Sequence, residues 1–343
     1  MRLFLTGGAG YIGSHTVLAA VRAGHSVSIF DDFSNSDPSV IDALRRTSNA
    51  TIDLVEGDVR DTDRVRVALL DVRPDAVLHF AGVKSVGESV EKPRKYYDIN
   101  VSGTLSLMEA MEAADVRAMV FSSSATVYGN PQYLPIDEEH PLSATNPYGR
   151  SKLHVEEILG DQCLARPDWS VAILRYFNPV GADACGLIGE SPHGVPANLM
   201  PYVADVAAGD RDFVGVFGDD YDTRDGTGIR DYIHVSDLAE AHVAAVGWTA
   251  ACAGARAFNL GGGQGTSVLE MIGAFSRISG RTVPYRVLPR RPGDVASCFA
   301  DPSRAAAELN WKVRRGIEEM CESGWKWRSQ VMQSAGTSAP AVR

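Results

Sequence analysis

A glycine-rich segment near the N-terminus restricts the fold of this chain more than any other sequence feature. Residues 6–13 read Thr-Gly-Gly-Ala-Gly-Tyr-Ile-Gly and directly follow an apolar run at 3–6. A helical pattern of apolar residues comes next, at Val17, Leu18 and Val21. Gly7, Gly10 and Gly13 permit a tight turn, close approach to a pyrophosphate and close packing of the helix on a sheet. The segment therefore predicts the first strand, turn and helix of a dinucleotide-binding fold.

Short apolar runs alternate with helical patterns through the first half of the chain, which is typical of βαβ units and a parallel sheet. The runs that qualify as strands are 3–6, 27–30, 52–55, 76–80, 118–122 and 171–175. Together with the glycine-rich turn, they predict an α/β fold with a doubly wound parallel (Rossmann) sheet. We expect a smaller α/β C-terminal domain to bind the substrate.

The alternation ends near residue 178, where glycine- and proline-rich loops begin. Loops of this length are uncommon unless they are functional. We predict a cofactor-binding domain of residues 1–177, which the helical pattern in about 233–250 rejoins. Residues 178–232 and 251–332 are expected to form the substrate-binding domain, and the small, polar residues 333–343 a disordered tail.

Charge and composition exclude several classes of function. Of the 343 residues 45% are apolar, and 43 acidic against 33 basic side chains give a net charge of -10. An acidic chain without a basic cluster is a poor nucleic-acid binder, because grouped Lys and Arg hold the phosphates. No run of about 18 apolar residues indicates a membrane span, and the N-terminus lacks a signal-peptide pattern.

The cysteines indicate a reducing compartment. They are widely spaced, with no Cys-x-x-Cys pair and no histidine placed to complete a zinc site: Cys163, Cys185, Cys252, Cys298 and Cys321. We therefore expect reduced thiols in a cytoplasmic protein, and no metal site.

The second predicted strand ends in two carboxylates, Asp31 and Asp32, 18 residues beyond Gly13. An acidic group at this place accepts hydrogen bonds from the adenosine ribose of a dinucleotide. Two carboxylates would repel the 2′-phosphate of NADP, so we expect NAD; the alternative is that both only cap a loop. Further candidates, at the ends of the third and fourth strands, are Asp58 near the adenine and, lining the cleft, Phe80, Ala81 and Gly82.

Tyr148 and Lys152 lie four residues apart where a helical pattern begins, so they share one helix face. Pro147 suits the first turn, which places the pair near the positive end of the helix. Lowering the phenol pKa of about 10 by about 3 requires roughly 4 kcal/mol, which the ammonium, the helix terminus and a cationic nicotinamide can supply. We expect Tyr148 to act as the base, with Ser124 bonding the same substrate oxygen. A lone Tyr-x-x-x-Lys is common by chance, and the preceding nucleotide-binding motif supports the catalytic interpretation.

With these residues, the sequence resembles the extended short-chain dehydrogenase/reductase family from residue 6 to about 327. The most specific segments are 6–15 (TGGAGYIGSH), 55–60 (VEGDVR), 79–84 (HFAGVK), 121–129 (FSSSATVYG), 174–181 (LRYFNPVG) and 226–235 (GTGIRDYIHV). The resemblance implies a tightly bound NAD, a homodimer and interconversion of UDP-galactose with UDP-glucose. It implies transient oxidation at sugar C4, rotation of the ketopyranose and return of the hydride, with Tyr148 taking the proton of the 4-hydroxyl and Lys152 holding the nicotinamide ribose.

The resemblance also implies ligands for both molecules. For NAD it adds Tyr11, Ile12, Asn35, Val59, Lys84, Ser122, Tyr148, Lys152 and Tyr176. For the UDP-hexose it implies Lys84, Ser124, Tyr148, Phe177, Asn178, Asn198, Leu199, Phe217, Arg230, Tyr232, Arg291, Asp294 and Cys298. Arg230 and Arg291 suit the diphosphate because guanidinium groups bind phosphates bidentately, and Asp294 can accept ribose hydroxyls.

Three positions depart from the pattern of the family. Asp32 stands where many members have an asparagine after the first acidic residue, which should further exclude NADP. Ile99 stands where some members place an asparagine near the cofactor, although Asn100 follows it. At Cys298, members differ between tyrosine and a small residue beside the C2 substituent of the sugar. A small side chain leaves room for an N-acetyl group, so we expect activity on UDP-GlcNAc and UDP-GalNAc as well; the alternative is a packed thiol without a role in specificity.

Other functions within the same superfamily remain as alternatives. Another nucleotide-sugar 4-epimerase would share these motifs. A 4,6-dehydratase needs an acid and a base, usually Asp-Glu, directly after the catalytic hydroxyl residue, whereas Ala125 and Thr126 follow Ser124. A non-catalytic NAD-sensing protein would typically lack the tyrosine or the lysine, and both are present.

Overall fold

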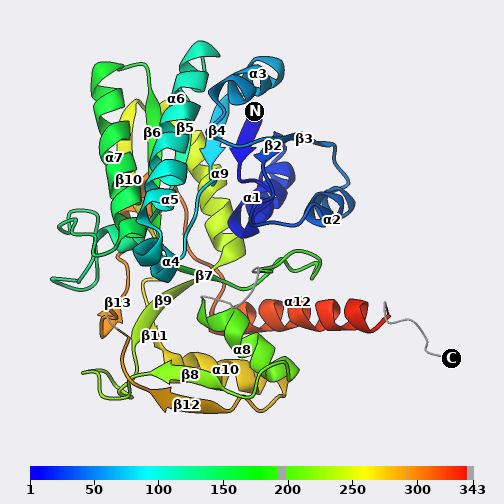
Figure 1. Cartoon of the computed structure of the whole chain (residues 1–343), viewed down its shortest axis with the longest axis vertical. Helices are drawn as coiled ribbons and strands as arrows, with labels where there is room; N and C mark the ends of the chain where they lie inside the picture. Colours follow the sequence, from blue (N-terminus) through cyan, green and yellow to red (C-terminus); the bar gives the residue numbers. More distant parts are fainter. Residues whose placement is uncertain (192–197, 292, 338–343) are drawn as a thin grey trace.

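The computed structural model describes residues 1–191, 198–291 and 293–337. Figure 1 shows an upper lobe built around a large sheet and a smaller lower lobe, and α12 (Ile317–Thr337) lies across the lower lobe. No helix in these ranges is long and apolar enough to cross a membrane.

The large sheet is parallel and has seven strands in the order β10-β6-β5-β4-β1-β2-β3. The strands are β1 (Arg2–Thr6), β2 (Ser26–Asp31), β3 (Ile52–Glu56), β4 (Ala76–His79), β5 (Ala118–Ser124), β6 (Ser170–Tyr176) and β10 (Gly254–Leu260). The chain reverses direction across the sheet at β1, which lies between β2 and β4. This is the switch point at which doubly wound sheets bind their ligands, so the predicted fold class is confirmed.

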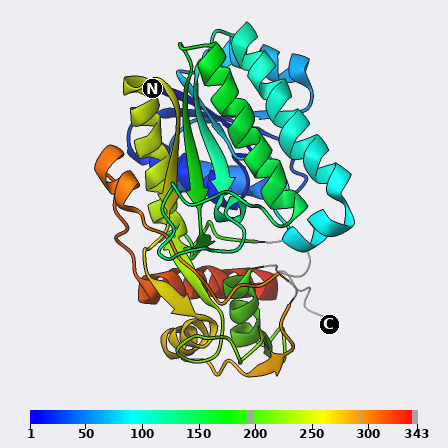
Figure 2. The same cartoon turned by 90° about the vertical axis from the view of Figure 1, so that its left-hand side faces the viewer.

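Helices cover both faces of this sheet, because apolar side chains alternate between its two sides. On one face lie α1 (Tyr11–Arg22), α2 (Ser39–Ser48) and α9 (Val235–Ala251). On the other lie α3 (Thr62–Val72), α6 (Gly103–Ala113) and α7 (Pro147–Ala165). Figure 2 shows the strands running toward the lower lobe, so their carboxyl ends face it. The helix α9 thus packs on the large sheet, although it follows the first strands of the lower lobe in the chain.

Shorter helical segments connect these elements. They are α4 (Val86–Glu91), α5 (Pro93–Tyr96), a π-helix η1 (Tyr97–Ser102), a 3-10 turn η2 (Ala125–Val127) and α11 (Ser303–Glu308).

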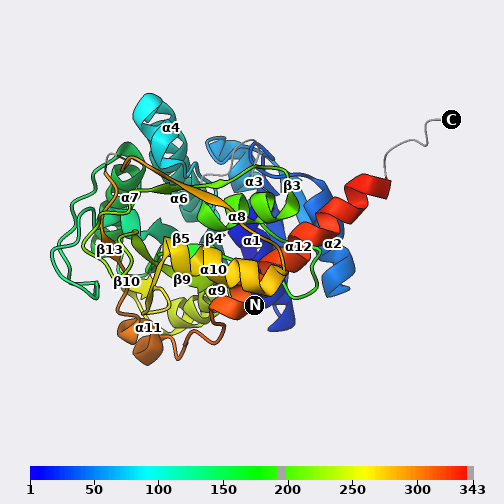
Figure 3. The same ribbon diagram turned by 90° about the horizontal axis from the view of Figure 1, so that it is seen from below.

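The lower lobe consists of short strands and helices around its own apolar core. Its sheet pairs β9 (Ile229–His234) with β7 (Asn178–Val180), β11 (Gly265–Ser267) and β13 (Ser297–Cys298), and β8 (Val214–Phe217) pairs with β12 (Tyr285–Leu288). In Figure 3, α12 lies alongside α8 (Leu199–Ala208) and α10 (Val268–Ser279), and the three helices contact one another.

The structure corrects two predicted boundaries. Strand β10 and helix α11 lie within 251–332, yet β10 pairs with β6 and α11 packs on the core of the large sheet. These segments therefore belong to the first domain. The predicted tail, 333–343, begins inside α12, which continues to Thr337, and its remainder lies outside the described residues.

Candidate active site

The glycine-rich turn forms a backbone cradle at the carboxyl end of β1. Gly7 has a left-handed φ of +70°, and a Cβ there would lie 2.6 Å from the nitrogen of Ala81. A Cβ on Gly13 would lie 2.4 Å from the carbonyl oxygen of Gly7. Gly10 begins α1 without a side-chain cap, so the first amides of the helix point into the cradle's space. Only a backbone without side chains leaves this room for a pyrophosphate at a helix N-terminus, so the residues fit a dinucleotide.

Asp31 connects this cradle to β2. Its buried carboxylate accepts hydrogen bonds from the amides of Ala9 and Phe33, both at 2.9 Å, and from the Ser36 hydroxyl at 3.0 Å. Burial raises the pKa of Asp31, and these donors act in the opposite direction. The carboxylate therefore has a loop-holding role as well, and its contact with a ribose stays a prediction.

The other expected adenosine ligands lie near the ends of β2 and β3. Asp32 and Asn35 are exposed, and Val59 is buried beside Asp58. Hydrogen bonds from Arg60 lower the pKa of Asp58. Asp58 is thus an ionised hydrogen-bond acceptor near the end of β3. The Arg60 guanidinium already donates to it, so its contact with an adenine stays a prediction.

The loop after β4 borders the catalytic helix through Asn100, in η1. Its side chain accepts a hydrogen bond from the Val83 amide at 2.8 Å and donates to the Ser151 hydroxyl at 2.9 Å. A Cβ on Gly82 would lie 3.7 Å from Nζ of Lys152. The expected cofactor segment 80–82 is therefore beside Lys152. Asn100 was noted in the sequence, but its hydrogen bonds to Val83 and Ser151 were not predicted.

Tyr148 and Lys152 lie in the first two turns of α7 and are buried. Asn146 caps the helix by accepting a hydrogen bond from the Gly149 amide at 2.9 Å. Nζ of Lys152 donates to the Ser122 carbonyl oxygen at 2.9 Å, at the end of β5. This contact places the ammonium at the carboxyl edge of the sheet, where the cofactor cradle also lies.

Ser124 ends β5 and is the next side chain of this edge. Its hydroxyl oxygen accepts a hydrogen bond from the Thr126 hydroxyl at 3.0 Å. Ser124 is also close enough to Tyr148 to oppose the rise that burial gives to the pKa of Tyr148. The structure therefore brings Tyr148, Ser124 and Lys152 together at this edge, and their catalytic roles stay predictions.

Burial acts on the pKa of Tyr148 in the direction opposite to that of the nearby positive charges. Burial raises its pKa, and the interaction with Ser124 only opposes that rise. Burial also lowers the pKa of Lys152 to about 8. In the chain alone, desolvation thus outweighs the polar neighbours of Tyr148. The fall in the phenol pKa expected with a bound cationic nicotinamide stays a prediction.

Four of the residues expected to bind the UDP-hexose form a cluster in the lower lobe. Asp294 pairs with Arg291 at 3.0 Å and with Arg230 at 3.8 Å. The Arg291 guanidinium lies 4.4 Å from the ring centroid of Phe217. Two cations, one carboxylate and an aromatic ring therefore meet in a site that suits a diphosphate and a planar base.

Strand register connects this cluster to the sugar side. Cys298 lies opposite Arg230 in the β13–β9 pair, and Asn178 lies opposite Tyr232 in the β7–β9 pair. Cys298 also packs on an apolar cluster that includes Phe177 and the partly buried Ala125, next to Ser124. Burial raises the pKa of Cys298 to about 11, so its thiol is neutral at neutral pH.

Glu190 was not predicted, yet it joins two expected ligands. Its Oε1 accepts hydrogen bonds from Nζ of Lys84 at 3.1 Å and from Nδ2 of Asn198 at 2.9 Å. Asn198 precedes α8, which begins at Leu199. No spacing rule relates positions 84, 190 and 198, so the sequence carries no signal for this bridge. The remaining expected cofactor residue, Tyr176, is buried at the end of β6.

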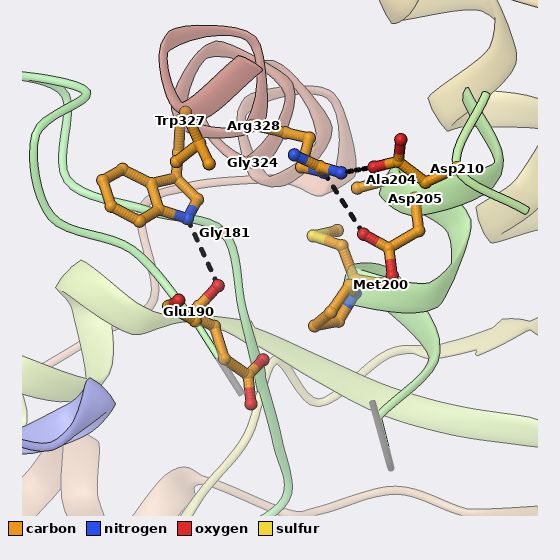
Figure 4. A pocket seen from close by; sticks show the side chains of 12 residues that line it. Gly181, Glu190, Met200, Ala204, Asp205, Asp210, Gly324, Trp327 and Arg328 are labelled. Carbon is orange, nitrogen blue, oxygen red and sulfur yellow. Dashed lines mark hydrogen bonds and ion pairs between the residues drawn. The ribbon is translucent and has the colours of Figure 1, made fainter. Parts of the chain in front are cut away.

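A pocket of about 280 Å³ lies on the other side of Glu190, between α8 and α12. Figure 4 shows Trp327 donating to the Glu190 carbonyl oxygen and Arg328 directed at Asp205 and Asp210. The pocket contains none of the catalytic side chains and is therefore separate from the active site. Within the described ranges, no group of three or more His, Cys, Asp or Glu residues is arranged to hold a metal ion.

Comparisons with known proteins agree with this arrangement. A sequence model of the family described as GDP-mannose 4,6 dehydratase matches residues 4–324. The chain is 52% identical to the UDP-glucose 4-epimerase of Bacillus subtilis (strain 168) over 329 residues, which are 96% of this chain and 97% of the relative.

Solved structures give the same result. The UDP-glucose 4-epimerase of Stenotrophomonas maltophila, with bound NAD and formylated UDP-arabinopyranose, has a TM-score of 0.96 at 50% identity and covers 97% of this chain and 99% of its own. The Bifidobacterium longum enzyme, in complex with NAD+ and UDP, has a TM-score of 0.93 at 48% identity and covers 96% and 98%. The chain therefore belongs to the UDP-glucose 4-epimerase family within the extended short-chain dehydrogenases/reductases.

Proposed function

We propose that this chain interconverts UDP-galactose and UDP-glucose at sugar carbon 4 with NAD as its cofactor. The observation that carries the proposal is the convergence of Tyr148, Ser124 and Lys152 beside the glycine cradle at one edge of the sheet. Membership of the family gives the substrate class, and the Arg230–Asp294–Arg291 cluster supplies the charge that a UDP diphosphate needs.

The chain's own residues account for cofactor binding. The amides at the start of α1 bind the pyrophosphate, and Lys152 binds the nicotinamide ribose while remaining anchored to the Ser122 carbonyl. When bound, NAD accepts and returns the hydride of sugar C4, and its oxidised ring adds positive charge that favours a phenolate. Asp31 and Asp32 oppose a 2′-phosphate, which favours NAD over NADP.

Tyr148 takes the proton of the sugar 4-hydroxyl at its phenol oxygen, and Ser124 bonds the same sugar oxygen. The lower lobe binds the remote UDP firmly through Arg230, Arg291 and Asp294. Binding energy from this remote group secures the sugar near Tyr148 while few contacts restrain its ring, as an inversion at C4 requires.

A single assay tests the proposal. The purified protein is expected to carry an NAD absorbance and to convert UDP-galactose to UDP-glucose without added cofactor. A 4-keto-6-deoxy product would indicate the dehydratase instead, and no turnover would contradict the proposal. The structure disfavours a dehydratase because Ala125 and Thr126 in η2 offer no carboxyl group beside Ser124.

We further propose that the enzyme accepts UDP-GalNAc and UDP-GlcNAc, because Cys298 is small and lies opposite Arg230 of the substrate cluster in the β13–β9 register. Cys298→Tyr is expected to lower kcat/KM for UDP-GalNAc by about 5- to 160-fold, since an overpacked site costs about 1–3 kcal/mol. UDP-galactose turnover should change much less. The matched control is Cys252→Tyr, at an exposed thiol at the end of α9. Equal losses on both sugars, or no activity on UDP-GalNAc in either protein, would contradict this role.

We also propose a cytoplasmic homodimer that contacts through helices of the upper lobe. Val90 on α4 and Leu105 on α6 support this because their side chains are 64% and 47% exposed. The five unpaired thiols suit a reducing compartment. Light scattering should give twice the chain mass of 36.8 kDa, and a monomeric mass would contradict the dimer.

A further inference from the structure

One face of α7 carries a third charged side chain in line with the catalytic pair. Tyr148, Lys152 and Glu156 follow one another at intervals of four residues, so they share this face. Glu156 is 6% exposed, and the proposed reaction gives it no part. Burying a carboxylate is costly unless it is paired and hydrogen-bonded, so its contacts should explain its presence.

Glu156 bonds to the two strands that carry the active-site edge. It accepts a hydrogen bond from the hydroxyl of Ser123, the residue before Ser124 in β5. It also accepts from Arg175 of β6, at 2.6 Å from Nη2 and 3.0 Å from Nε. Arg175 lies opposite Ser123 in the β5–β6 register, so one carboxylate holds a facing pair of strand residues.

Successive residues of β5 are thereby fixed to successive turns of α7. The Ser122 carbonyl accepts from Lys152, and the Ser123 hydroxyl donates to Glu156. A shift of α7 along β5 would break both contacts together. The two contacts therefore set the distance between Tyr148, at the start of α7, and Ser124, at the end of β5.

The network extends to the edge of the sheet. Nη1 of Arg175 donates to the Tyr128 hydroxyl at 3.0 Å, and that hydroxyl donates to Oδ1 of Asn259 in β10 at 2.6 Å. Each of these side chains is buried. The carboxylate thus belongs to a satisfied polar network across α7, β5, β6 and β10, which resists displacement more than a single bond would.

We propose that Glu156 is a positioning residue that holds Tyr148 and Lys152 in catalytic register with Ser124, through Ser123 and Arg175. The proposal rests on the proposed epimerase function. A buried ion pair by itself says little about stability, so the competing explanation is an ion pair that serves the fold alone. The two explanations differ in kcat, because small displacements of reacting groups cost rate at unchanged affinity.

Ser123→Ala tests the proposal because it removes the strand contact of Glu156 and leaves the ion pair with Arg175 intact. We expect kcat for UDP-galactose to fall about tenfold with KM within about twofold, since a displacement near 1 Å costs up to about 10²-fold. With UDP-galactose deuterated at C4, the isotope effect on kcat should rise, because hydride transfer becomes the slower step.

The matched control is Ser106→Ala, at a buried serine of α6 whose hydroxyl bonds Thr62 at 2.8 Å. It should lose comparable thermal stability and keep the wild-type kcat. Glu156→Gln should lower kcat at least as far as Ser123→Ala, because it also removes the charge that pairs with Arg175. The double variant should fall no further than Glu156→Gln, because both side chains act through one network. If Glu156→Gln does not fold, the comparison of Ser123→Ala with Ser106→Ala still distinguishes a positioning role from a purely structural one.

The outcomes separate this proposal from the function on which it rests. A wild-type protein without UDP-galactose turnover would overturn the function. An active wild type with unchanged kcat in Ser123→Ala, or an equal fall in Ser106→Ala, would overturn only the positioning role of Glu156.

Discussion

Replacing Tyr148 by phenylalanine is expected to lower kcat for UDP-galactose by about 10²–10⁴-fold, the usual contribution of a general acid–base group. The variant removes one hydroxyl and keeps a ring that packs edge-on against Tyr96 at 6.4 Å between centroids. Folding and the bound NAD should therefore persist, and only the proton acceptor for the sugar 4-hydroxyl is lost. Turnover at saturating UDP-galactose measures the effect.

Tyr96→Phe is the matched control, because Tyr96 is also buried beside the site. Its hydroxyl donates to Glu88 at 3.1 Å and has no role in the proposed reaction. We expect a loss of about 1 kcal/mol in the free energy of unfolding, the usual value of one hydrogen bond, with near-normal kcat. If Tyr148→Phe kept more than about a tenth of the wild-type kcat, another group would have to accept the proton.

Six strands of the large sheet were predicted from their apolar runs, and one of them, β3, is an edge strand like β10. Strand β10 escaped prediction because its start is half-exposed and Arg256 interrupts the apolar pattern there. In the lower lobe, β7, β11 and β13 have only two or three residues each. Periodicity cannot identify strands of this length, because an alternation needs about four residues to appear.

The catalytic residues could be predicted because their chemistry follows from local spacing. A helical interval of four brings Tyr148 and Lys152 together, and the end of a strand places Ser124 at the sheet edge. The bridge through Glu190 depends on the tertiary fold, since it joins Lys84 to Asn198 across the two lobes. A pattern along the chain could not reveal this bridge, because Lys84 and Glu190 are distant in sequence.

The effect of burial on the pKa of Tyr148 could not be predicted from sequence for a related reason. Charges near a phenol can be inferred from spacing, but its burial is a property of the packed site. In the folded chain burial raises this pKa, and Ser124 compensates only in part. We therefore expect the positive charge of bound NAD to add to that of Lys152 in favouring the phenolate.

Gly13→Ala is expected to deprive the purified protein of its NAD. The added Cβ would lie 2.4 Å from the Gly7 carbonyl oxygen and 2.8 Å from Cα of Gly8, and backbone atoms cannot rotate away. The glycine-rich turn cannot move away from the added Cβ either, because Gly7 already packs on the backbone of Ala81 after β4. The start of α1 must therefore move away from the cradle, and its amides with it.

Overpacking costs about 1–3 kcal/mol, which corresponds to about 5- to 160-fold weaker NAD binding if it falls on the bound state. Absorbance of the purified protein and rescue of turnover by added NAD measure this loss. The control is Gly247→Ala in α9, where a Cβ meets nothing within 4 Å. It should raise stability by about 0.5–1 kcal/mol, because alanine is the better helix former, and keep the bound NAD. If Gly13→Ala retained its NAD as well as Gly247→Ala does, the cradle would not be the pyrophosphate site.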